Sequence, residues 1–214
     1  MLGNFNIAPM NLLKIAPLRK DVFATLASGK GLAHWIATRQ DGLEVKGGGH
    51  ARISATLLDL ALEHHIGIVH LLDARIYGSA FALLRIEFEA FIRATWLQLC
   101  ATPKELDAFE KNDTFNLTFG QMINEIERHQ NFQDKVLSGL KENAWKAMNS
   151  YTHGGLHQVA RRMKKGNIEP NYEPDEVIEV LKASGYLALL ALLQIARLAE
   201  NVDLEKEVNA KLRG

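Results

Sequence analysis

Apolar residues recur at helical spacing along most of this chain. Positions three or four residues apart predict a long amphipathic helix from Ala51 to about Gly67, with a continuation to Leu72. A second long helix is predicted from Ser79 to Cys100, where aromatic and aliphatic side chains cover much of the circumference. No stretch shows the sustained alternation that is typical of a half-buried strand, so the pattern predicts an all-α fold.

Two short helices are predicted after these long ones, because each begins with a capping box. Thr102 is followed by Pro103 and by Glu105, a combination that starts a helix running to about residue 111. Thr118 and Gln121 have the same three-residue spacing and predict a helix to about residue 129.

The C-terminal half divides at a pair of glycines. A helix that begins near residue 134 or 139 is expected to end at Tyr151, since Gly154 and Gly155 can supply a left-handed terminating residue. Residues 156–163 allow a helical restart, and residues 164–173 read as a polar loop. Pro174 then opens a last long helix, which is expected to reach about residue 201.

The first fifty residues are less regular. Pro9 and Pro17 interrupt the start, a weak helix is predicted over residues 19–39, and three glycines at 47–49 form a flexible connector. These features predict an N-terminal arm or irregular helical cap at residues 1–50, followed by a helical bundle at residues 51–214.

Composition favours an ordinary globular protein of the cytoplasm. Twenty-five basic and twenty-five acidic residues balance, so no global field draws the chain to nucleic acid or to an anionic membrane. Cys100 is the single cysteine and excludes an intrachain disulfide, which fits a reducing compartment. The start lacks the pattern of a signal peptide, and the apolar run from Tyr186 to Ile195 is far shorter than the roughly 20 residues of a membrane span.

A polar row lies on the otherwise apolar helix that begins at Ser79. Arg85, Glu89 and Arg93 follow one another at four-residue steps and therefore share one face. The simpler interpretation is pairing of the three charges within the helix. The alternative is a cationic pocket wall, in which Glu89 holds one arginine while the other meets an anion or a partner chain.

A helix with three histidines invites a metal hypothesis, which the spacing does not favour. A helical zinc pair needs two histidines four residues apart, whereas His65 and His70 are five apart, and His64 points about 100° from His65. Surface or core hydrogen bonding is the preferred interpretation of these residues and of Glu63. Neither a metal nor another cofactor is predicted.

The strongest candidate site surrounds His153. Histidine suits proton transfer near neutral pH, the two glycines beside it allow close approach, and Asn149 lies one helical turn before it. One interpretation is a general acid or base held by Asn149, with nearby arginines neutralising a phosphate. The other is a helix C-cap, in which a histidine interacts with the helix dipole and the basic residues solvate the next turn.

Three segments together resemble the HEPN superfamily (higher eukaryotes and prokaryotes nucleotide-binding domains) over roughly residues 51–201. They are the stretch 60–65, the stretch 79–85 with Glu89 and Arg93, and the stretch 151–155. The resemblance implies an up-and-down helical bundle, a homodimer, and an origin in bacterial toxin–antitoxin or phage-defence systems. Many members are metal-independent ribonucleases that combine an arginine, the polar residue after it and a histidine four to six positions further on.

Carried onto this chain, the resemblance assigns His153 to the histidine but finds no arginine before it. Lys146 and Asn149 occupy the upstream positions, and lysine lacks the planar fork that grips a phosphate. Arg85 or Arg93 from the neighbouring helix is the expected substitute. The predicted catalytic residues are His153, Asn149, Arg85 and Arg93; the predicted substrate-binding residues are Glu89, Tyr151, His157, Arg161 and Arg162.

Two functions follow from these assignments. The first is an RNA-cleaving or RNA-binding effector, which requires the site residues to converge in an exposed cleft. The second is a non-catalytic dimeric interaction or regulatory module, in which Arg85, Glu89 and His153 satisfy one another in a buried network. The expected partners are a second copy of the chain, RNA, and a protein such as an antitoxin or defence component, with no membrane.

Overall fold

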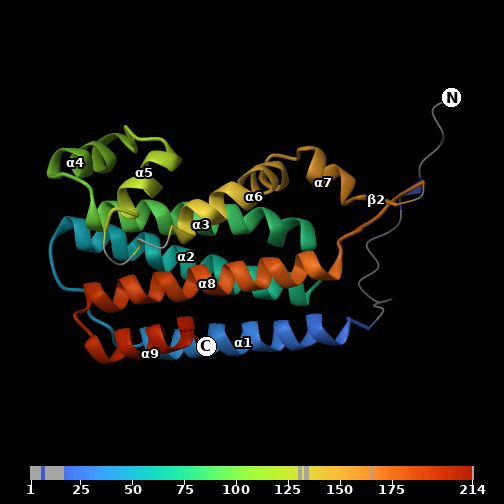
Figure 1. The fold of residues 1–214 in the computed structure, drawn as a ribbon, viewed down its shortest axis with the longest axis horizontal. Helices are drawn as coiled ribbons and strands as arrows, with labels where there is room; N and C mark the ends of the chain where they lie inside the picture. The colour runs from blue at the N-terminus through green and yellow to red at the C-terminus, as the bar shows by residue number, and fades with distance from the viewer. Residues whose placement is uncertain (1–5, 8–16, 130–131, 133–134, 165, 214) are drawn as a thin grey trace.

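The fold is all-α, as the hydrophobic pattern predicts. The computed structural model describes residues 6–7, 17–129, 132, 135–164 and 166–213. Nine helices lie within these residues (Figure 1): α1 Lys20–Gln40, α2 Gly49–Asp73, α3 Tyr77–Leu99, α4 Pro103–Asn112, α5 Phe119–Ile126, α6 Val136–Thr152, α7 Leu156–Ala160, α8 Pro174–Leu198 and α9 Val202–Arg213.

The long helices form a bundle around α8. Helices α2 and α3 pair along their lengths, α8 packs against both of them, and α1 and α9 pack against α8. Because α8 has neighbours on nearly every side, its residues from Leu187 to Ala196 are all buried, which explains why every residue of that stretch except Gln194 is apolar. Helices α2 and α8 have the length and apolar composition of a membrane span, and 72% of the apolar window of α8 is buried in the bundle.

Both predicted capping boxes are confirmed. The backbone N–H of Glu105 donates to the Thr102 hydroxyl and the Thr102 N–H donates back to the Glu105 carboxylate, at 3.4 and 2.8 Å. Thr118 and Gln121 make the same reciprocal pair at the start of α5. Two of the four unpaired N–H groups at each helix start are thereby satisfied by local sequence alone.

Helix α1 is a full member of the bundle. It is a continuous helix whose Val22, Leu26 and Ile36 side chains are buried, and it packs against α8 and α2. Residues 20–40 therefore belong to the packed bundle and not to a separate arm. Pro9 and the rest of the N-terminal arm at residues 1–5 and 8–16 lie outside the described residues.

Two features near the C-terminal half differ from the prediction. A small three-stranded sheet, β1 (Asn6–Ile7), β2 (Met163–Lys164) and β3 (Asn167–Ile168), forms partly within the predicted loop: β3 is central, parallel to β1 and antiparallel to β2. The predicted last helix is also two helices, because α8 ends at Leu198 and Glu200 adopts a left-handed backbone (φ 54°) before α9 begins.

Polar side chains interrupt the core between α2, α3 and α8. His65 is 1% exposed, and its Nδ1 lies 2.7 Å from the Ser184 hydroxyl, whereas Glu87 is completely buried. Burial lowers the pKa of His65 to about 4 and raises the pKa of Glu87 well above its ordinary range, the second effect being only partly opposed by the nearby Ser184 hydroxyl. Burial therefore favours the uncharged form of both groups in the folded protein.

Candidate functional site

The charged row on α3 is paired, as the four-residue spacing predicts. Nε and Nη2 of Arg85 donate to the same Glu89 carboxylate oxygen at 3.0 and 2.7 Å. The other Glu89 oxygen lies 4.0 Å from Nη2 of Arg93, which is an ion pair without a close hydrogen bond. The Arg85 and Glu89 side chains are 16% and 22% exposed, and that of Arg93 is 45% exposed. The row thus runs from a mostly buried arginine to a half-exposed one.

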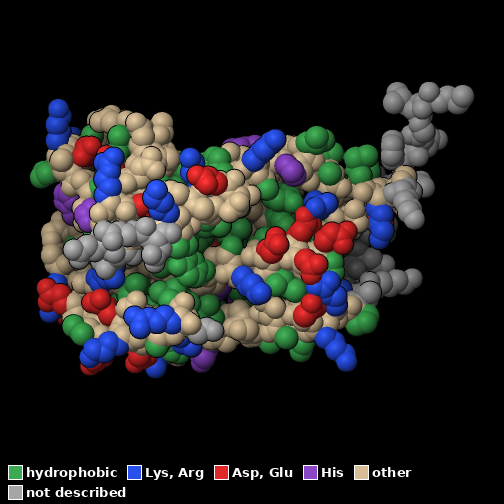
Figure 2. All heavy atoms as spheres, in the orientation of Figure 1, with side chains coloured by type: hydrophobic (Ala, Val, Ile, Leu, Met, Phe, Trp, Pro, Cys, Tyr) green, Lys and Arg blue, Asp and Glu red, His purple; other side chains and the backbone are tan. Residues whose placement is uncertain are grey.

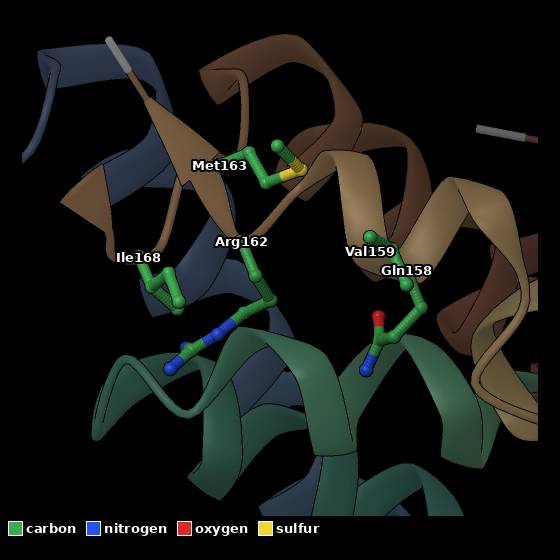
Figure 3. Close-up of a pocket in the computed structure, with 5 residues that line it drawn as sticks. All are labelled: Gln158, Val159, Arg162, Met163 and Ile168. Atoms are coloured by element: carbon green, nitrogen blue, oxygen red, sulfur yellow. The ribbon is translucent and has the colours of Figure 1, made fainter. Parts of the chain in front are cut away.

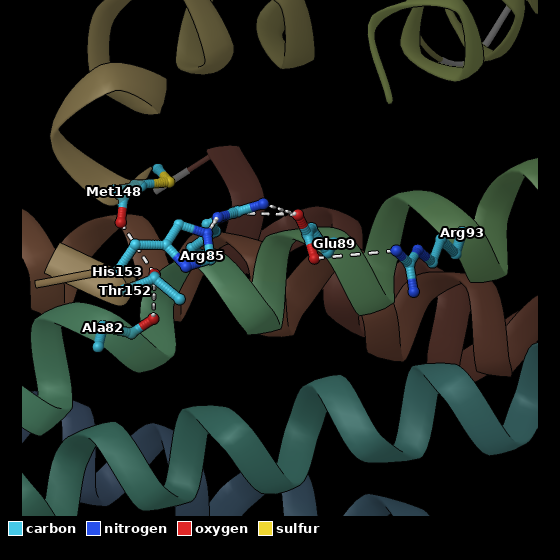
Figure 4. Close-up of polar contacts among 7 residues, drawn as sticks. All are labelled: Ala82, Arg85, Glu89, Arg93, Met148, Thr152 and His153. Atoms are coloured by element: carbon cyan, nitrogen blue, oxygen red, sulfur yellow. Dashed lines mark hydrogen bonds and ion pairs between the residues drawn. The ribbon is translucent and has the colours of Figure 1, made fainter. Parts of the chain in front are cut away.

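The end of α6 brings His153 to this row. The Thr152 hydroxyl shares its one proton between the carbonyl of Met148 in its own helix, at 2.9 Å, and the carbonyl of Ala82 on α3, at 3.2 Å (Figure 4). The second contact ties the last turn of α6 to α3. His153 is the C-cap residue, its N–H donates to the Asn149 carbonyl at 3.0 Å, and Gly154 takes the left-handed conformation (φ 64°) that ends the helix. His153 and Gly154 thus end α6 where the C-cap interpretation predicts, and the exposed imidazole lies against α3.

Arg85 is the arginine that the structure brings to His153. Its Nη1 contacts Nε2 of His153, 68 residues away in the chain, and Figure 4 shows the imidazole and the guanidinium side by side. A guanidinium can only donate hydrogen bonds, so Nε2 of His153 is the acceptor in this contact. Arg85, Glu89 and His153 are thus brought together, with Arg93 at the far end of the row.

Trp145 is a member of this site that sequence reasoning missed. The Arg85 guanidinium carbon lies 4.9 Å from the centre of the Trp145 ring, and Phe119 stacks on the same indole at 4.4 Å with an interplanar angle of 13°. The stacking holds the plane of the guanidinium in one orientation. The available signal was the position of Trp145 about two helical turns before His153 on the same amphipathic helix.

Asn149 contributes to the site through its backbone. Its carbonyl accepts the His153 N–H, and no hydrogen bond from its side chain to His153 occurs among the described residues. The prediction that the Asn149 side chain positions His153 is therefore wrong. The backbone hydrogen bonds of α6 and the contact of Thr152 with α3 position His153 instead.

Tyr151, His157 and Arg161 form a separate set of contacts. Arg161 is paired with Glu176 of α8 and also interacts with the Tyr151 hydroxyl. Burial raises the pKa of Tyr151, so this phenol stays protonated at neutral pH. His157 is exposed, 6.4 Å from the Tyr151 ring between centroids. These residues link α7 to α8, and none of their described contacts reaches Arg85 or His153.

Arg162 lies in a third place. With Gln158, Val159, Met163 and Ile168 it lines a pocket of about 290 Å³ between α7, the β2–β3 hairpin and the start of α3. Figure 3 shows its guanidinium directed toward α3 and away from Met163. The predicted substrate-binding residues after His153 are therefore separated: Arg161 is in an ion pair, Arg162 lies in a pocket wall, and His157 is exposed to solvent.

The surface has no broad basic stripe on the face in view. Lys and Arg side chains are interspersed with Asp and Glu over this face (Figure 2), in keeping with the zero net charge of the chain. Any phosphate contact at Arg85 and Arg93 is therefore local. Within the part of the chain that the structure describes, no group of three or more His, Cys, Asp or Glu residues is arranged to hold a metal ion.

Gly155 is required by close packing at the turn that follows His153. A Cβ atom at this position would lie 2.5 Å from the Ser150 hydroxyl oxygen and 3.0 Å from the Ser150 Cα. We expect Gly155→Ala to lower the free energy of unfolding by about 1–3 kcal/mol, measured by urea denaturation. Gly139→Ala is the matched control, because nothing lies within 4 Å of its added Cβ inside α6. A Gly155→Ala protein as stable as the control would contradict this packing.

The comparison with known proteins identifies a family for this chain but no individual relative. Residues 58–213 match the model of a family of unknown function (DUF6988), which spans α3 to α9, most of α2 and all the site residues. No curated protein and no solved structure matches the chain.

Proposed function

The chain belongs to DUF6988, a family of unknown function, and from the geometry of its site we propose that it is a metal-independent endoribonuclease. His153 and Arg85 are the proposed catalytic pair. The contact between these two side chains, from different helices and beside an exposed imidazole, is the observation that carries the proposal. It supplies the arginine and histidine that the resemblance to the HEPN superfamily calls for.

The chemistry needs only these two groups and the RNA itself. With a phosphodiester between them, Arg85 donates to the non-bridging oxygens, and the lone pair on Nε2 of His153 takes the proton of the 2′-hydroxyl. The 2′-oxygen then forms a bond to phosphorus as the bond from phosphorus to the 5′-oxygen breaks. The imidazolium formed at His153 then gives this proton to the departing 5′-oxygen, so the products are a 2′,3′-cyclic phosphate and a 5′-hydroxyl and the imidazole is restored. The guanidinium stabilises the charge that develops on the phosphoryl oxygens.

The test is cleavage of a labelled single-stranded RNA by the purified full chain in the presence of excess chelator. We expect products that end in a 2′,3′-cyclic phosphate, and no cleavage of the same sequence with 2′-O-methyl groups, because the attacking hydroxyl is then blocked. A parallel preparation of His153→Ala is the control for contaminating nuclease. Cleavage that requires a divalent ion, or that proceeds on the methylated RNA, would contradict this mechanism.

The quaternary and cellular setting are part of the same proposal. We infer a homodimer from the HEPN resemblance, with RNA as the substrate and a toxin–antitoxin or phage-defence role in the cytoplasm. The apolar faces of α3 and α8 are covered by helices of the same chain. A dimer contact is therefore expected on the outward faces of the bundle.

One observation favours a second function, that of a non-catalytic interaction module. Glu89 occupies two N–H groups of Arg85, His153 accepts from a third, and Trp145 covers the guanidinium face, so the network is satisfied internally. Under this alternative, the chelator assay detects no cleavage, and replacing His153 lowers the stability of the fold. Measurements on wild type and His153→Ala therefore distinguish the two functions.

A further inference from the structure

The fork of Arg85 that would bind a phosphate is already filled by a carboxylate. Its Nε and Nη2 both donate to one Glu89 oxygen, at 3.0 and 2.7 Å, and a guanidinium binds phosphate oxygens through the same N–H groups. A phosphate cannot reach these two N–H groups until Glu89 moves. Glu89 therefore competes directly with any anion for the same two donors.

Arg85 itself is held in place by contacts that do not involve Glu89. The Trp145 ring lies 4.9 Å from the guanidinium carbon, and Nη1 contacts His153. The side chain is only 16% exposed. The Trp145 ring and the surrounding residues therefore keep the guanidinium in the same orientation when the carboxylate leaves.

Glu89 has a second cation within reach on the same helix. Its Oε2 lies 4.0 Å from Nη2 of Arg93, and Figure 4 shows the carboxylate between the two arginines. Arg93 is half-exposed and sits over the Phe115 ring at 5.3 Å. A small rotation of the carboxylate would replace the bond to Arg85 with one to Arg93, and partly exposed ion pairs of this kind exchange at little cost.

We propose that Glu89 is a placeholder for the phosphate of the ligand, which on binding moves from Arg85 to Arg93. Glu89 is then a positioning residue that gates the arginine, and Arg93 acts through Glu89 without contacting the anion. The inference rests on the site of the proposed function and adds its regulation: an empty site is closed by an internal anion, and only a ligand with a well-placed phosphate opens it.

The test is a double-mutant cycle on anion affinity. Inorganic phosphate and a 2′-O-methyl oligoribonucleotide are titrated calorimetrically into wild type, Glu89→Gln, Arg93→Gln and the double variant at one ionic strength. We expect Glu89→Gln to bind phosphate about 10-fold more tightly, a difference of about 1.4 kcal/mol. Arg93→Gln should bind several-fold more weakly than wild type, and the double variant should match Glu89→Gln alone.

Two charge-matched controls distinguish the specific effect of Glu89 and Arg93 from the effect of a changed net charge. Glu44→Gln, in the exposed loop between α1 and α2, and Arg52→Gln, on the exposed surface of α2, change the net charge by the same amounts. Both should leave phosphate affinity within about twofold of wild type. Circular dichroism and thermal melting check the folding of each variant. If Glu89→Gln folds poorly, Arg93→Gln still tests the proposal, because its side chain is half-exposed.

Several outcomes would overturn the placeholder role. Glu89→Gln that binds phosphate no better than wild type would show that Glu89 only pairs charges. Arg93→Gln that weakens binding equally with and without Glu89 would show that Arg93 contacts the anion directly. If wild type does not cleave RNA but the four proteins show the expected phosphate affinities, Glu89 is a placeholder at an anion-binding site and the ribonuclease proposal fails. If wild type cleaves RNA but the affinities differ from those expected, the ribonuclease proposal stands and the placeholder role of Glu89 fails.

Discussion

His153→Ala is expected to reduce RNA cleavage by about 10²–10⁴-fold, the range by which a positioned general base accelerates proton transfer. The same substitution should lower the melting temperature by no more than about 3 °C. Its imidazole is exposed, and one hydrogen bond, to Arg85, links it to the rest of the described structure through its side chain. A large loss of activity with a small loss of stability is the signature of a catalytic residue.

The measurement pairs single-turnover cleavage with thermal unfolding of the same preparations. His34→Ala is the matched control, since it removes an exposed histidine from α1 and should change neither quantity. An inactive wild type together with a drop of many degrees in His153→Ala would favour the interaction-module alternative. Equal cleavage by wild type and His153→Ala would trace the activity to a contaminant.

Glu87→Gln is expected to make the protein more stable, by an amount that grows as the pH rises. Glu87 is completely buried and its pKa is raised well above the ordinary value, so the folded state keeps a proton that the unfolded chain loses above about pH 4.5. Wild-type stability therefore falls as pH increases from 4.5 toward the pKa of the folded state. Glutamine does not titrate, so Glu87→Gln removes this dependence of the free energy of unfolding on pH.

The expected difference between Glu87→Gln and wild type is near zero at about pH 4. Above about pH 4.5 it grows by about 1.4 kcal/mol per pH unit for as long as the folded state keeps the proton. For a chain of this length, each kcal/mol of that difference raises the melting temperature by about 2–4 °C. Urea denaturation and thermal melting at half-unit pH steps measure it. His65, whose pKa is lowered to about 4, costs stability as the pH falls below 6.5, but this contribution is common to both proteins and cancels in the difference.

Glu44→Gln provides the control for this series, because an exposed carboxylate in the loop after α1 should leave the pH profile parallel to that of wild type. A Glu87→Gln profile parallel to wild type would mean that Glu87 is ionised in the folded protein. The core between α2, α3 and α8 would then have to hold a charge with a compensating partner.

Sequence alone was sufficient for features that depend on neighbours within about one helical turn. The capping boxes at Thr102 and Thr118, the glycine stop after His153 and the Arg85–Glu89–Arg93 row all follow from spacings of three or four residues. Such contacts form whenever the local helix forms, whatever the rest of the chain does. The all-α class follows for the same reason, from the period of the apolar residues.

Contacts between distant segments were decided only by the tertiary structure. The sequence offered both Arg85 and Arg93 as the cation for His153, and the docking of α6 on α3 through Thr152 selects Arg85 and adds Trp145. The rotation of one helix against another depends on the packing of many side chains at once, which no single sequence period encodes.

The same reason explains the residues whose environment the sequence left open. Glu87 lies on a helix that is apolar nearly all round, so only the burial of that face by α2 and α8 shows that the pKa of its carboxyl group is raised. Helix α1 has weak amphipathic character, and its place in the bundle follows from the apolar surface that α8 and α2 present to it. Local pattern determined the helices of this protein; their mutual packing determined its candidate site.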